Sequence, residues 1–371
     1  MWSNWAEGEL AAIRQADRWR SLVAFDASGP AGALRGRDVI AFSSNDYLGL
    51  SQHPQVCAAA RDAIDRFGTG ATASRLIVGT RSLHVELEES LARAKRMERA
   101  LIFPNGFSAN LGVLSVFGAA DVTIFSDELN HASIIDGCRL AKAKVIVYRH
   151  CDLDHLATLM QSTPGRKIVA TDSVFSMDGD TAPLTELGKL CGEHAALLVI
   201  DEAHAVLGPE PDIGACELLR VGTLSKTLGS LGGWVAGSRA LIDLLINRAR
   251  SFIFTTGLSP ADTAAALAAL RICYSDEGDA LRAHLRALID MLAPNHPSPV
   301  VPVVLGEDRA ALAAAEHLLT HGIYVPAIRP PTVARGTARL RIALSAAHTS
   351  AMVEKLRAAL QSLPQPDHQP Q

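Results

Sequence analysis

Residues 168–204 read IVATDSVFSMDGDTAPLTELGKLCGEHAALLVIDEAH, and this stretch decides the class of fold. It begins with an apolar run at 168–171, continues through a helix-like segment at 184–194 and ends in a second apolar run at 197–200. Strands that are apolar on both faces and separated by a helix are typical of a parallel sheet that is covered by helices on both sides. The stretch therefore predicts an α/β fold.

The same alternation continues on both sides of this stretch. Further strands are predicted at 100–103, 122–125, 144–148 and 219–222, and further helices at 83–97, 110–117, 132–141 and 153–160. We therefore predict a large α/β domain over residues 41–290, built on a mostly parallel sheet.

Two smaller parts flank this domain. Apolar residues at helical intervals in 2–19 predict an N-terminal helical arm within residues 1–40, which we expect to pack against a larger body. After the proline-rich segment 294–302 we predict a small C-terminal α+β domain over residues 291–371. Its strands are expected at 301–305, 323–328 and 339–344, its helices at 309–321 and from 350, and an irregular tail at 364–371.

Composition excludes several classes of protein. The 371 residues are 48% hydrophobic and 20% charged, which is enough for a buried core and argues against disorder. The formal net charge of −4 argues against a sequence-independent nucleic-acid binder. No apolar run has the length of a membrane span, the N-terminus does not resemble a secretory signal, and no two of the six cysteines have CxxC spacing. We expect a cytoplasmic enzyme or small-molecule binder with reduced cysteines and no metal.

Polar residues follow the predicted strands, at the edge where ligands bind in parallel sheets. Lys226 follows the strand at 219–222, and in neutral form its amine can form an imine with an aldehyde cofactor. Asp201 ends a wholly apolar strand, where a protonated pyridine nitrogen would compensate its buried charge. His131 follows the strand at 122–125 and could stack on the same ring.

Each of these three residues also has a plainer interpretation. Lys226 could be a surface lysine in a loop, Asp201 an ordinary helix N-cap, and His131 a satisfied polar residue at the start of a helix. Taken singly, Lys226 and His131 fit the plainer interpretation better. The hypothesis of a site rests on the fact that all three residues are predicted at the same edge of the sheet.

A glycine turn at the same edge suits a phosphate. Asn105-Gly106-Phe107-Ser108 opens a predicted helix and presents backbone N–H groups there, and the hydroxyls of Thr223 and Ser225 follow a neighbouring strand.

Other motifs fail on detail. The glycine pattern at 68–73 follows a helical segment rather than a strand, so it is a weak dinucleotide fingerprint. The DEAH sequence at 201–204 has no GxxxxGK[ST] motif upstream, which argues against a helicase. Neither HExxH nor GxSxG occurs, so zinc-peptidase and serine-hydrolase chemistry lack their motifs.

Taken together, the motifs resemble those of the α-oxoamine synthases, pyridoxal-phosphate (PLP) enzymes of the aminotransferase-like fold. The matching blocks are FSSNDYLG at 42–49, NGF at 105–107, FSMDGD at 175–180, DEAH at 201–204 and GTLSK at 222–226. Each block is weak alone, but their joint order and spacing over nearly the whole chain are specific. The resemblance implies a PLP-dependent transferase of fold type I, with a large domain and a small C-terminal one.

The resemblance also implies roles for individual residues. It implies that Lys226 forms the Schiff base and carries the proton at Cα, that Asp201 pairs with the pyridine nitrogen, that His204 contacts the ring hydroxyl and that His131 stacks on the ring. It implies that Gly106, Phe107, Ser176, Thr223 and Thr255 help to hold the cofactor, and that Arg20, His131, Arg329, Thr332 and Arg341 bind substrate. Thr255 would act on the phosphate of a neighbouring subunit, which implies a homodimer with sites at its interface. Arg339 would share a face of its strand with Arg341, so geometry alone does not separate the two as carboxylate ligands.

Within the family, the block IRPPT at 328–332 and the short N-terminus favour the branch that condenses L-alanine with a pimeloyl thioester of coenzyme A or acyl-carrier protein. The segments between 208 and 222 and near 294 are shorter than in typical members. Three alternatives stay open: a glycine- or serine-using member (2-amino-3-ketobutyrate CoA ligase, 5-aminolevulinate synthase or serine palmitoyltransferase), a nicotinamide dehydrogenase, and a non-enzymatic scaffold.

Overall fold

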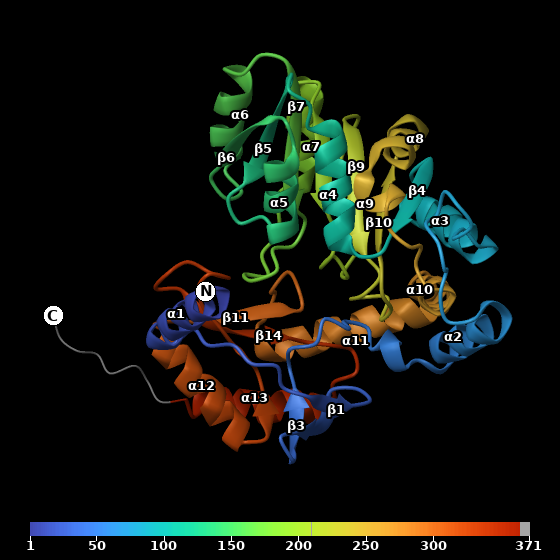
Figure 1. The fold of residues 1–371 in the computed structure, drawn as a ribbon. Coiled ribbons are helices and arrows are strands. Elements are labelled where there is room, and N and C mark those ends of the chain that lie inside the picture. The colour runs from blue at the N-terminus through green and yellow to red at the C-terminus, as the bar shows by residue number, and fades with distance from the viewer. Residues whose placement is uncertain (209, 364–371) are drawn as a thin grey trace. The chain divides into compact units, whose positions relative to one another are not determined.

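The computed structural model describes residues 1–208 and 210–363, which form two compact units (Figure 1). One unit contains residues 48–176, 180–208 and 210–283, and the other contains residues 1–47, 177–179 and 284–363. We call them the sheet unit and the terminal unit. The tail predicted at 364–371 lies outside the described residues.

The sheet unit is built on seven strands in the order β4-β10-β9-β8-β7-β5-β6. The strands are β4 (Arg99–Phe103), β5 (Val122–Asp127), β6 (Lys144–Tyr148), β7 (Arg166–Asp172), β8 (Leu197–Asp201), β9 (Glu217–Thr223) and β10 (Gly233–Gly237). Only β10 runs antiparallel to its neighbours among these seven. The predicted fold class, a mostly parallel sheet with helices, is confirmed, and β10 is the one strand of the seven that the sequence analysis missed.

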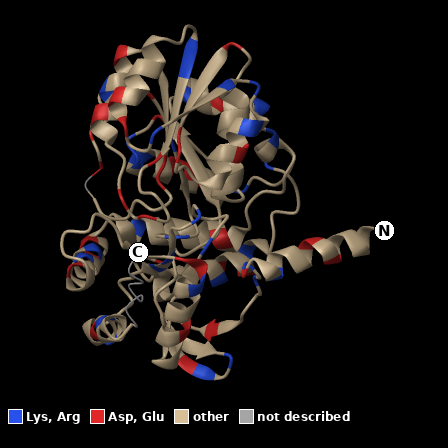
Figure 2. Ribbon diagram, turned by 90° about the vertical axis from the view of Figure 1, so that its left-hand side faces the viewer, with Lys and Arg blue, Asp and Glu red and all other residues tan. Residues whose placement is uncertain are grey.

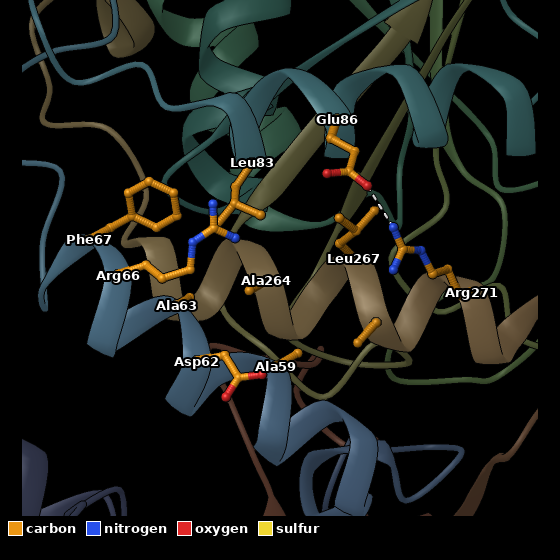
Figure 3. Close-up of a pocket in the computed structure, with 11 residues that line it drawn as sticks. Ala59, Asp62, Ala63, Arg66, Phe67, Leu83, Glu86, Ala264, Leu267 and Arg271 are labelled. Carbon is orange, nitrogen blue, oxygen red and sulfur yellow. Dashed lines mark hydrogen bonds and ion pairs between the residues drawn. The ribbon is translucent and has the colours of Figure 1, made fainter.

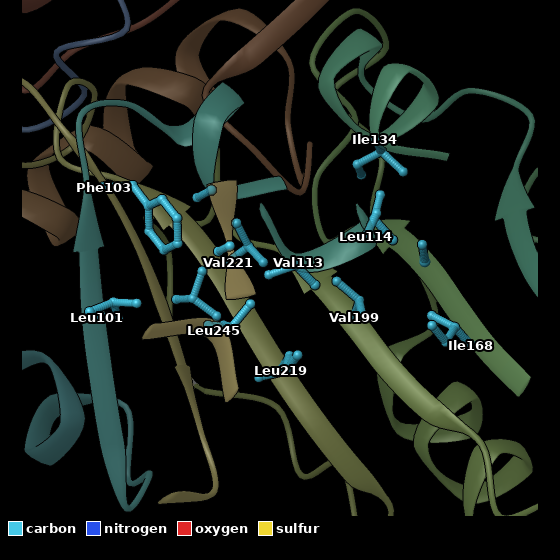
Figure 4. Packing of buried hydrophobic residues seen from close by; sticks show 14 of the residues in the cluster. Leu101, Phe103, Val113, Leu114, Ile134, Ile168, Val199, Leu219, Val221 and Leu245 are labelled. Carbon is cyan, nitrogen blue, oxygen red and sulfur yellow. The ribbon is translucent and has the colours of Figure 1, made fainter. Parts of the chain in front are cut away.

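Helices cover both faces of this sheet because alternate strand residues point to opposite sides. Ile168 and Val199 pack with α4 (Gly106–Phe117), α5 (Ala132–Leu140), α8 (Arg239–Arg248) and α9 (Arg250–Ile253), as Figure 4 shows for the buried cluster on that face. Their neighbours Val169 and Leu198 pack with α6 (Leu153–Gln161) and α7 (Leu184–Glu193) on the other face. The remaining elements of the unit are η1 (Leu50–Gln52), α2 (Pro54–Phe67), α3 (Ser82–Ala94) and α10 (Pro260–Cys273), with α11 (Asp276–Leu292) running across the chain boundary at 283.

The terminal unit contains two small sheets. Strands β1 (Phe25–Ala27), β2 (Ala31–Leu34), β3 (Arg37–Ala41) and β12 (Ile323–Tyr324) form one, and β11 (Val300–Gly306), β14 (Ala338–Ala343) and β13 (Ala327–Ile328) form the other. The single strand predicted at 323–328 is therefore two short strands in different sheets. Pro326 lies between them and lacks the N–H that a continuous strand would need. Helices α12 (Asp308–Thr320) and α13 (Ser350–Gln361) complete this part.

Helix α1 (Trp2–Gln15) begins as predicted but ends before residue 19. Asp17 has a left-handed backbone conformation (φ 55°), which stops the helix. No residue of α1 is buried, so its expected packing against a larger body is not seen within the described chain.

Acidic and basic side chains alternate along the outer helices rather than gathering by sign (Figure 2). This distribution agrees with the small net charge. Among the described residues, no helix combines the length and apolar character needed to cross a membrane.

Candidate active site

The predicted lysine lies against a buried histidine. Lys226 follows β9, and its Nζ is 2.8 Å from Nε2 of His204, which lies in the turn after β8. His204 is buried, so this pair is partly removed from water. The contact with a buried ring argues against Lys226 being an ordinary surface lysine.

Asp201 ends β8 and is only 5% exposed. Its Oδ2 accepts a hydrogen bond from the amide of Asn110 (2.6 Å), and its Oδ1 accepts one from the backbone N–H of Ala203 (2.9 Å). The local bond is the one that the N-cap alternative predicted, but residues 203 and 204 form a turn and not a helix. A buried carboxylate held at two oxygens, with no helix to cap, is placed to receive a cationic ligand.

Glu202, the acidic residue that follows Asp201, has other partners. Glu202 is buried in ion pairs with Lys95 (Nζ–Oε2 2.9 Å) and with Arg220. This arrangement ties the DEAH segment to the body of the sheet unit, so Glu202 needs no nucleotide to explain it.

His131 is the N-cap residue of α5, and its Nδ1 accepts from the backbone N–H of Ser133 (3.2 Å). Its own backbone N–H donates to Oδ2 of Asp172 (2.7 Å), and its ring makes an edge contact with Phe107, with centroids 6.5 Å apart. The alternative of a satisfied polar residue at a helix start is thus present in the structure, together with an edge contact to Phe107, another residue predicted for the site. Burial lowers the pKa of His131; the nearby Asp201 opposes this shift and Lys226 adds to it, so the ring is neutral.

Asp172 is a second buried carboxyl group, paired in register with Asp201 on the neighbouring strand. Burial, and then the charge of Asp201, raises the pKa of Asp172 well above its usual value. The sequence analysis did not single out Asp172, although it ends an apolar strand as Asp201 does.

The glycine turn has the geometry of an anion site. Gly106 is the first residue of α4, and the side chain of Asn105 accepts from the N–H of Ser108 (2.8 Å), which leaves the N–H groups of Gly106 and Phe107 for a ligand. A Cβ placed on Gly106 would lie 3.5 Å from the side chain of Thr223, so the turn and Thr223 adjoin.

The hydroxyls of Thr223 and Ser225 are 2.7 Å apart, beside the turn. These groups fit the parts of PLP. The helix N-terminus with its two hydroxyls suits the phosphate, the lysine amine suits the aldehyde, and the buried carboxylate suits the pyridine nitrogen.

Two further predicted cofactor residues lie in loops of the same unit. Ser176 follows β7 and is partly exposed. Thr255 lies between α9 and α10, next to the bridge that pairs Thr256 with Ser74.

In the terminal unit, two of the predicted substrate residues contact each other and a third holds the N-terminal arm. Arg20 donates to the hydroxyl of Thr332 (3.2 Å), as expected if both contact one substrate. Arg329 donates to the backbone carbonyl oxygens of Asp17 and Trp19, so its guanidinium holds the N-terminal arm.

The structure distinguishes the two arginines of β14. Arg339 forms an ion pair with Asp178 and donates to the carbonyl oxygen of Thr337 (3.0 Å). Arg341 donates to the neutral amide oxygen of Asn45 (3.1 Å) and lies beside Tyr47, whose pKa burial raises to about 12. An arginine engaged with a carboxylate of its own chain is the poorer ligand for a substrate carboxylate, so the ion pair with Asp178 argues against Arg339 in that role.

A surface hollow lies elsewhere in the sheet unit (Figure 3). It is formed by α2, α3 and α10, with alanine side chains at its base and an ion pair between Glu86 and Arg271 (2.6 Å) at its rim. None of the predicted site residues lines it.

The sequence analysis also missed Asn110 and Ser133, which link Asp201 to His131. Both are almost fully buried. The available signal was an asparagine inside an otherwise apolar helix, because a buried amide needs partners.

Fold and site together define an enzyme of the aminotransferase-like class, with a lysine and a buried aspartate at the carboxyl ends of parallel strands. The family model for aminotransferase class I and II matches residues 37–360, and the chain belongs to that family.

Individual relatives show which members of the family the chain resembles. An 8-amino-7-oxononanoate synthase from Anaeromyxobacter dehalogenans is 48% identical over 96% of this chain and 94% of its own. A serine palmitoyltransferase from S. paucimobilis, solved with a bound PLP–myriocin aldimine, superposes with a TM-score of 0.90 at 28% identity over 96% of each chain. The crystal structure of 8-amino-7-oxononanoate synthase from Francisella tularensis superposes with a TM-score of 0.72 at 27% identity, over 87% of this chain and 97% of that one. The predicted resemblance to the α-oxoamine synthases is confirmed.

Proposed function

We propose that this protein is a PLP-dependent acyltransferase that makes 8-amino-7-oxononanoate. It condenses L-alanine with a pimeloyl thioester, and releases carbon dioxide and the free thiol of coenzyme A or acyl-carrier protein. The product belongs to biotin biosynthesis. The observation that carries the proposal is the 48% identity, over nearly the whole of both chains, to a synthase with this activity, together with a site that has the required groups.

PLP, when bound, supplies an electron sink for the negative charge that develops at Cα of alanine. With PLP bound, the amine of Lys226 would hold its aldehyde carbon and would carry the proton at Cα, and His204, 2.8 Å away, would orient that amine. The carboxylate of Asp201, held by Asn110, would pair with the pyridine nitrogen and favour its protonated form. His131 would lie against the ring.

The remaining roles follow from the donor groups. The N–H groups of Gly106 and Phe107 and the hydroxyl of Thr223 bind the phosphate, with Ser176 as a further polar contact. Arg341 anchors the alanine carboxylate until it leaves as carbon dioxide.

Arg20 and Thr332, which already contact each other, bind the acyl substrate. We assign Arg329 to the same site in an indirect role, because its guanidinium fixes the arm that carries Arg20.

We further propose a homodimer with its sites at the interface, in which Thr255 contacts the phosphate held by the partner subunit. The neighbouring Phe254 is 70% exposed, and such an apolar side chain is typical of an interface. We propose a cytoplasmic location, which agrees with six free cysteines.

A substrate panel tests the activity. The purified enzyme is assayed with alanine, glycine and serine against pimeloyl-CoA, pimeloyl-acyl-carrier protein and palmitoyl-CoA. We expect the highest kcat/KM for alanine with a pimeloyl thioester. The TM-score of 0.90 to a serine palmitoyltransferase makes serine with palmitoyl-CoA the alternative pair, and a preference for it would overturn the proposal.

A further inference from the structure

A continuous chain of buried hydrogen bonds joins Asp201 to His131. The amide nitrogen of Asn110 is 2.6 Å from Oδ2 of Asp201 and 2.9 Å from Oγ of Ser133. The Ser133 hydroxyl is in turn 2.8 Å from Nδ1 of His131. Asn110 and Ser133 are 0% and 1% exposed, so water does not compete for these groups.

The direction of each bond follows from chemistry. An amide nitrogen only donates, and its two hydrogens account for its two contacts, to Asp201 and to Ser133. The reverse amide orientation would set the amide oxygen of Asn110 against the carboxylate oxygen of Asp201 at 2.6 Å, which is repulsive. The amide oxygen therefore faces away, and it has no hydrogen-bond partner among the described residues although it is buried. A buried oxygen without a partner needs an explanation, and the two contacts made by the amide nitrogen supply one.

The direction of the bond between Ser133 and His131 follows from the backbone. The backbone N–H of Ser133 donates to Nδ1 of His131 (3.2 Å), so this nitrogen is an acceptor. The Ser133 hydroxyl, whose oxygen accepts from Asn110, therefore donates its hydrogen to the same Nδ1. With two donors directed at Nδ1, that nitrogen carries no hydrogen, and the neutral ring is protonated on Nε2.

We propose that Asn110 and Ser133 are positioning residues, which hold His131 as the neutral tautomer protonated on Nε2 and make this tautomer depend on the ionised carboxylate of Asp201. The residue proposed to pair with the pyridine nitrogen and the residue proposed to stack on the ring are thus one hydrogen-bonded unit. Nε2–H becomes the single donor of the His131 ring, and a donor of this kind suits the carbonyl oxygen of an acyl thioester.

This inference deepens the proposed function, but its test reads a proton position rather than turnover. The full-length enzyme is labelled with ¹⁵N-histidine, and the nitrogen shifts of His131 are recorded with cofactor bound and after its removal. His131→Asn identifies the signal. We expect Nδ1 to have the shift of an unprotonated nitrogen and Nε2 that of a protonated one. A ring protonated on Nδ1, or on both nitrogens at neutral pH, would overturn the proposal.

Variants of Ser133 and Asn110 test whether these residues set the tautomer of His131. Ser133→Ala and Asn110→Ala should give a mixture of tautomers and lower kcat/KM roughly 10- to 100-fold, as expected for a misplaced catalytic group. Ser115→Ala is the matched control, because this exposed serine lies on α4 with Asn110 and its hydroxyl bonds only to its own helix, and it should change neither readout. A pure Nε2–H signal and unchanged kinetics in Ser133→Ala would refute the role of Ser133. If the wild-type enzyme has this tautomer but lacks the predicted activity, only the proposed function is contradicted.

Discussion

Arg339 and Arg341 show how two identical side chains on one face of a strand acquire different partners. Both are buried on β14, but Arg339 is neutralised by Asp178, whereas Arg341 contacts the uncharged amide of Asn45. The sequence predicts that they share a face, because side chains alternate along a strand. It does not predict their partners, since Asp178 lies more than 160 residues away in the chain.

The two arginines should respond differently to substitution. Arg341→Ala should raise the KM for alanine roughly 10- to 100-fold, because a hydrogen bond to a charged group is lost. Arg339→Ala should leave that KM within about a factor of three but lower the free energy of unfolding by about 1–3 kcal/mol, because it leaves Asp178 unpaired. Steady-state kinetics and urea unfolding check the pair, and the reverse pattern would show that Arg339 binds the carboxylate.

Single residues were predictable where they end a strand. Lys226, Asp201 and His131 follow apolar runs, and parallel strands bring such ends to one edge. Asn110 and Ser133 lie within or at the start of helices, and their role depends on which faces of α4 and α5 meet. That meeting is a tertiary contact with no local signature.

At the scale of elements, the strand β10 supports the glycine turn. A Cβ on Gly233 would lie 2.4 Å from the backbone of Asn105 and 2.5 Å from the nitrogen of Gly106. This close approach explains why β10 begins with glycine, and why a strand so poor in β-branched residues was missed from sequence.

Gly233→Ala should therefore displace the turn. We expect weaker PLP binding and a loss of about 1–3 kcal/mol in the free energy of unfolding, as for other overpacked sites. Gly192→Ala is the matched control, because a Cβ there would meet nothing within 4 Å and the residue lies in α7, where alanine should add about 0.5–1 kcal/mol. Spectroscopic titration with PLP and thermal unfolding measure both effects. Equal behaviour of the two variants would contradict the supporting role of Gly233.

His150 joins two other connections of the sheet unit. Its Nδ1 contacts Asp127 at the end of β5 (2.9 Å) and its Nε2 contacts Asp180 after β7 (2.6 Å). Burial opposes protonation of the ring, but the hydrogen bonds and charges of the two carboxylates outweigh it and raise the pKa of His150.

This shift predicts how stability depends on pH. A raised folded-state pKa stabilises the protein fully below the unfolded-state value of ~6.5, and this stabilisation is lost as pH rises through the folded-state pKa. The Tm difference between wild type and His150→Gln should therefore be largest near pH ~5.5 and shrink towards alkaline pH. His194→Gln, at the end of α7, is the control and should show no such trend. A Tm difference that grows with pH would contradict the ion-pair account.

At the scale of the whole molecule, apolar side chains remain exposed next to a predicted site residue. Phe254 precedes Thr255, and the backbone bridge between Thr256 and Ser74 brings this segment beside Ile77 and Val78, which are 74% and 64% exposed. We expect these residues to be covered by a second copy of the chain.

Phe254→Ser should then weaken the dimer, because it removes apolar area from the interface. Sedimentation at micromolar concentration should show a larger monomer fraction, and PLP should bind more weakly if Thr255 acts across the interface. Leu140→Ser, which also changes an exposed apolar residue of the sheet unit, is the control. A wild-type protein that sediments as a monomer with full PLP affinity would refute the interface.

The overall class of fold was predictable because apolar strands and intervening helices have local signatures. The N-terminal strands β1–β3 and the antiparallel strand β10 were less so, since short or glycine-rich strands are defined mainly by their partners. The joining of residues 177–179 to the terminal unit depends on a contact between Asp178 and Arg339 that no local pattern encodes.

The most direct test of the account is to find the residue that carries the cofactor. The holoenzyme is reduced with borohydride, digested, and mapped by mass spectrometry, with Lys226→Ala as the negative control and exposed Lys189→Ala as the positive one. We predict a pyridoxyl mass on the peptide that contains Lys226 in the wild type and in Lys189→Ala, and none in Lys226→Ala. Labelling of a different lysine, or of none in the wild type, would contradict the central claim.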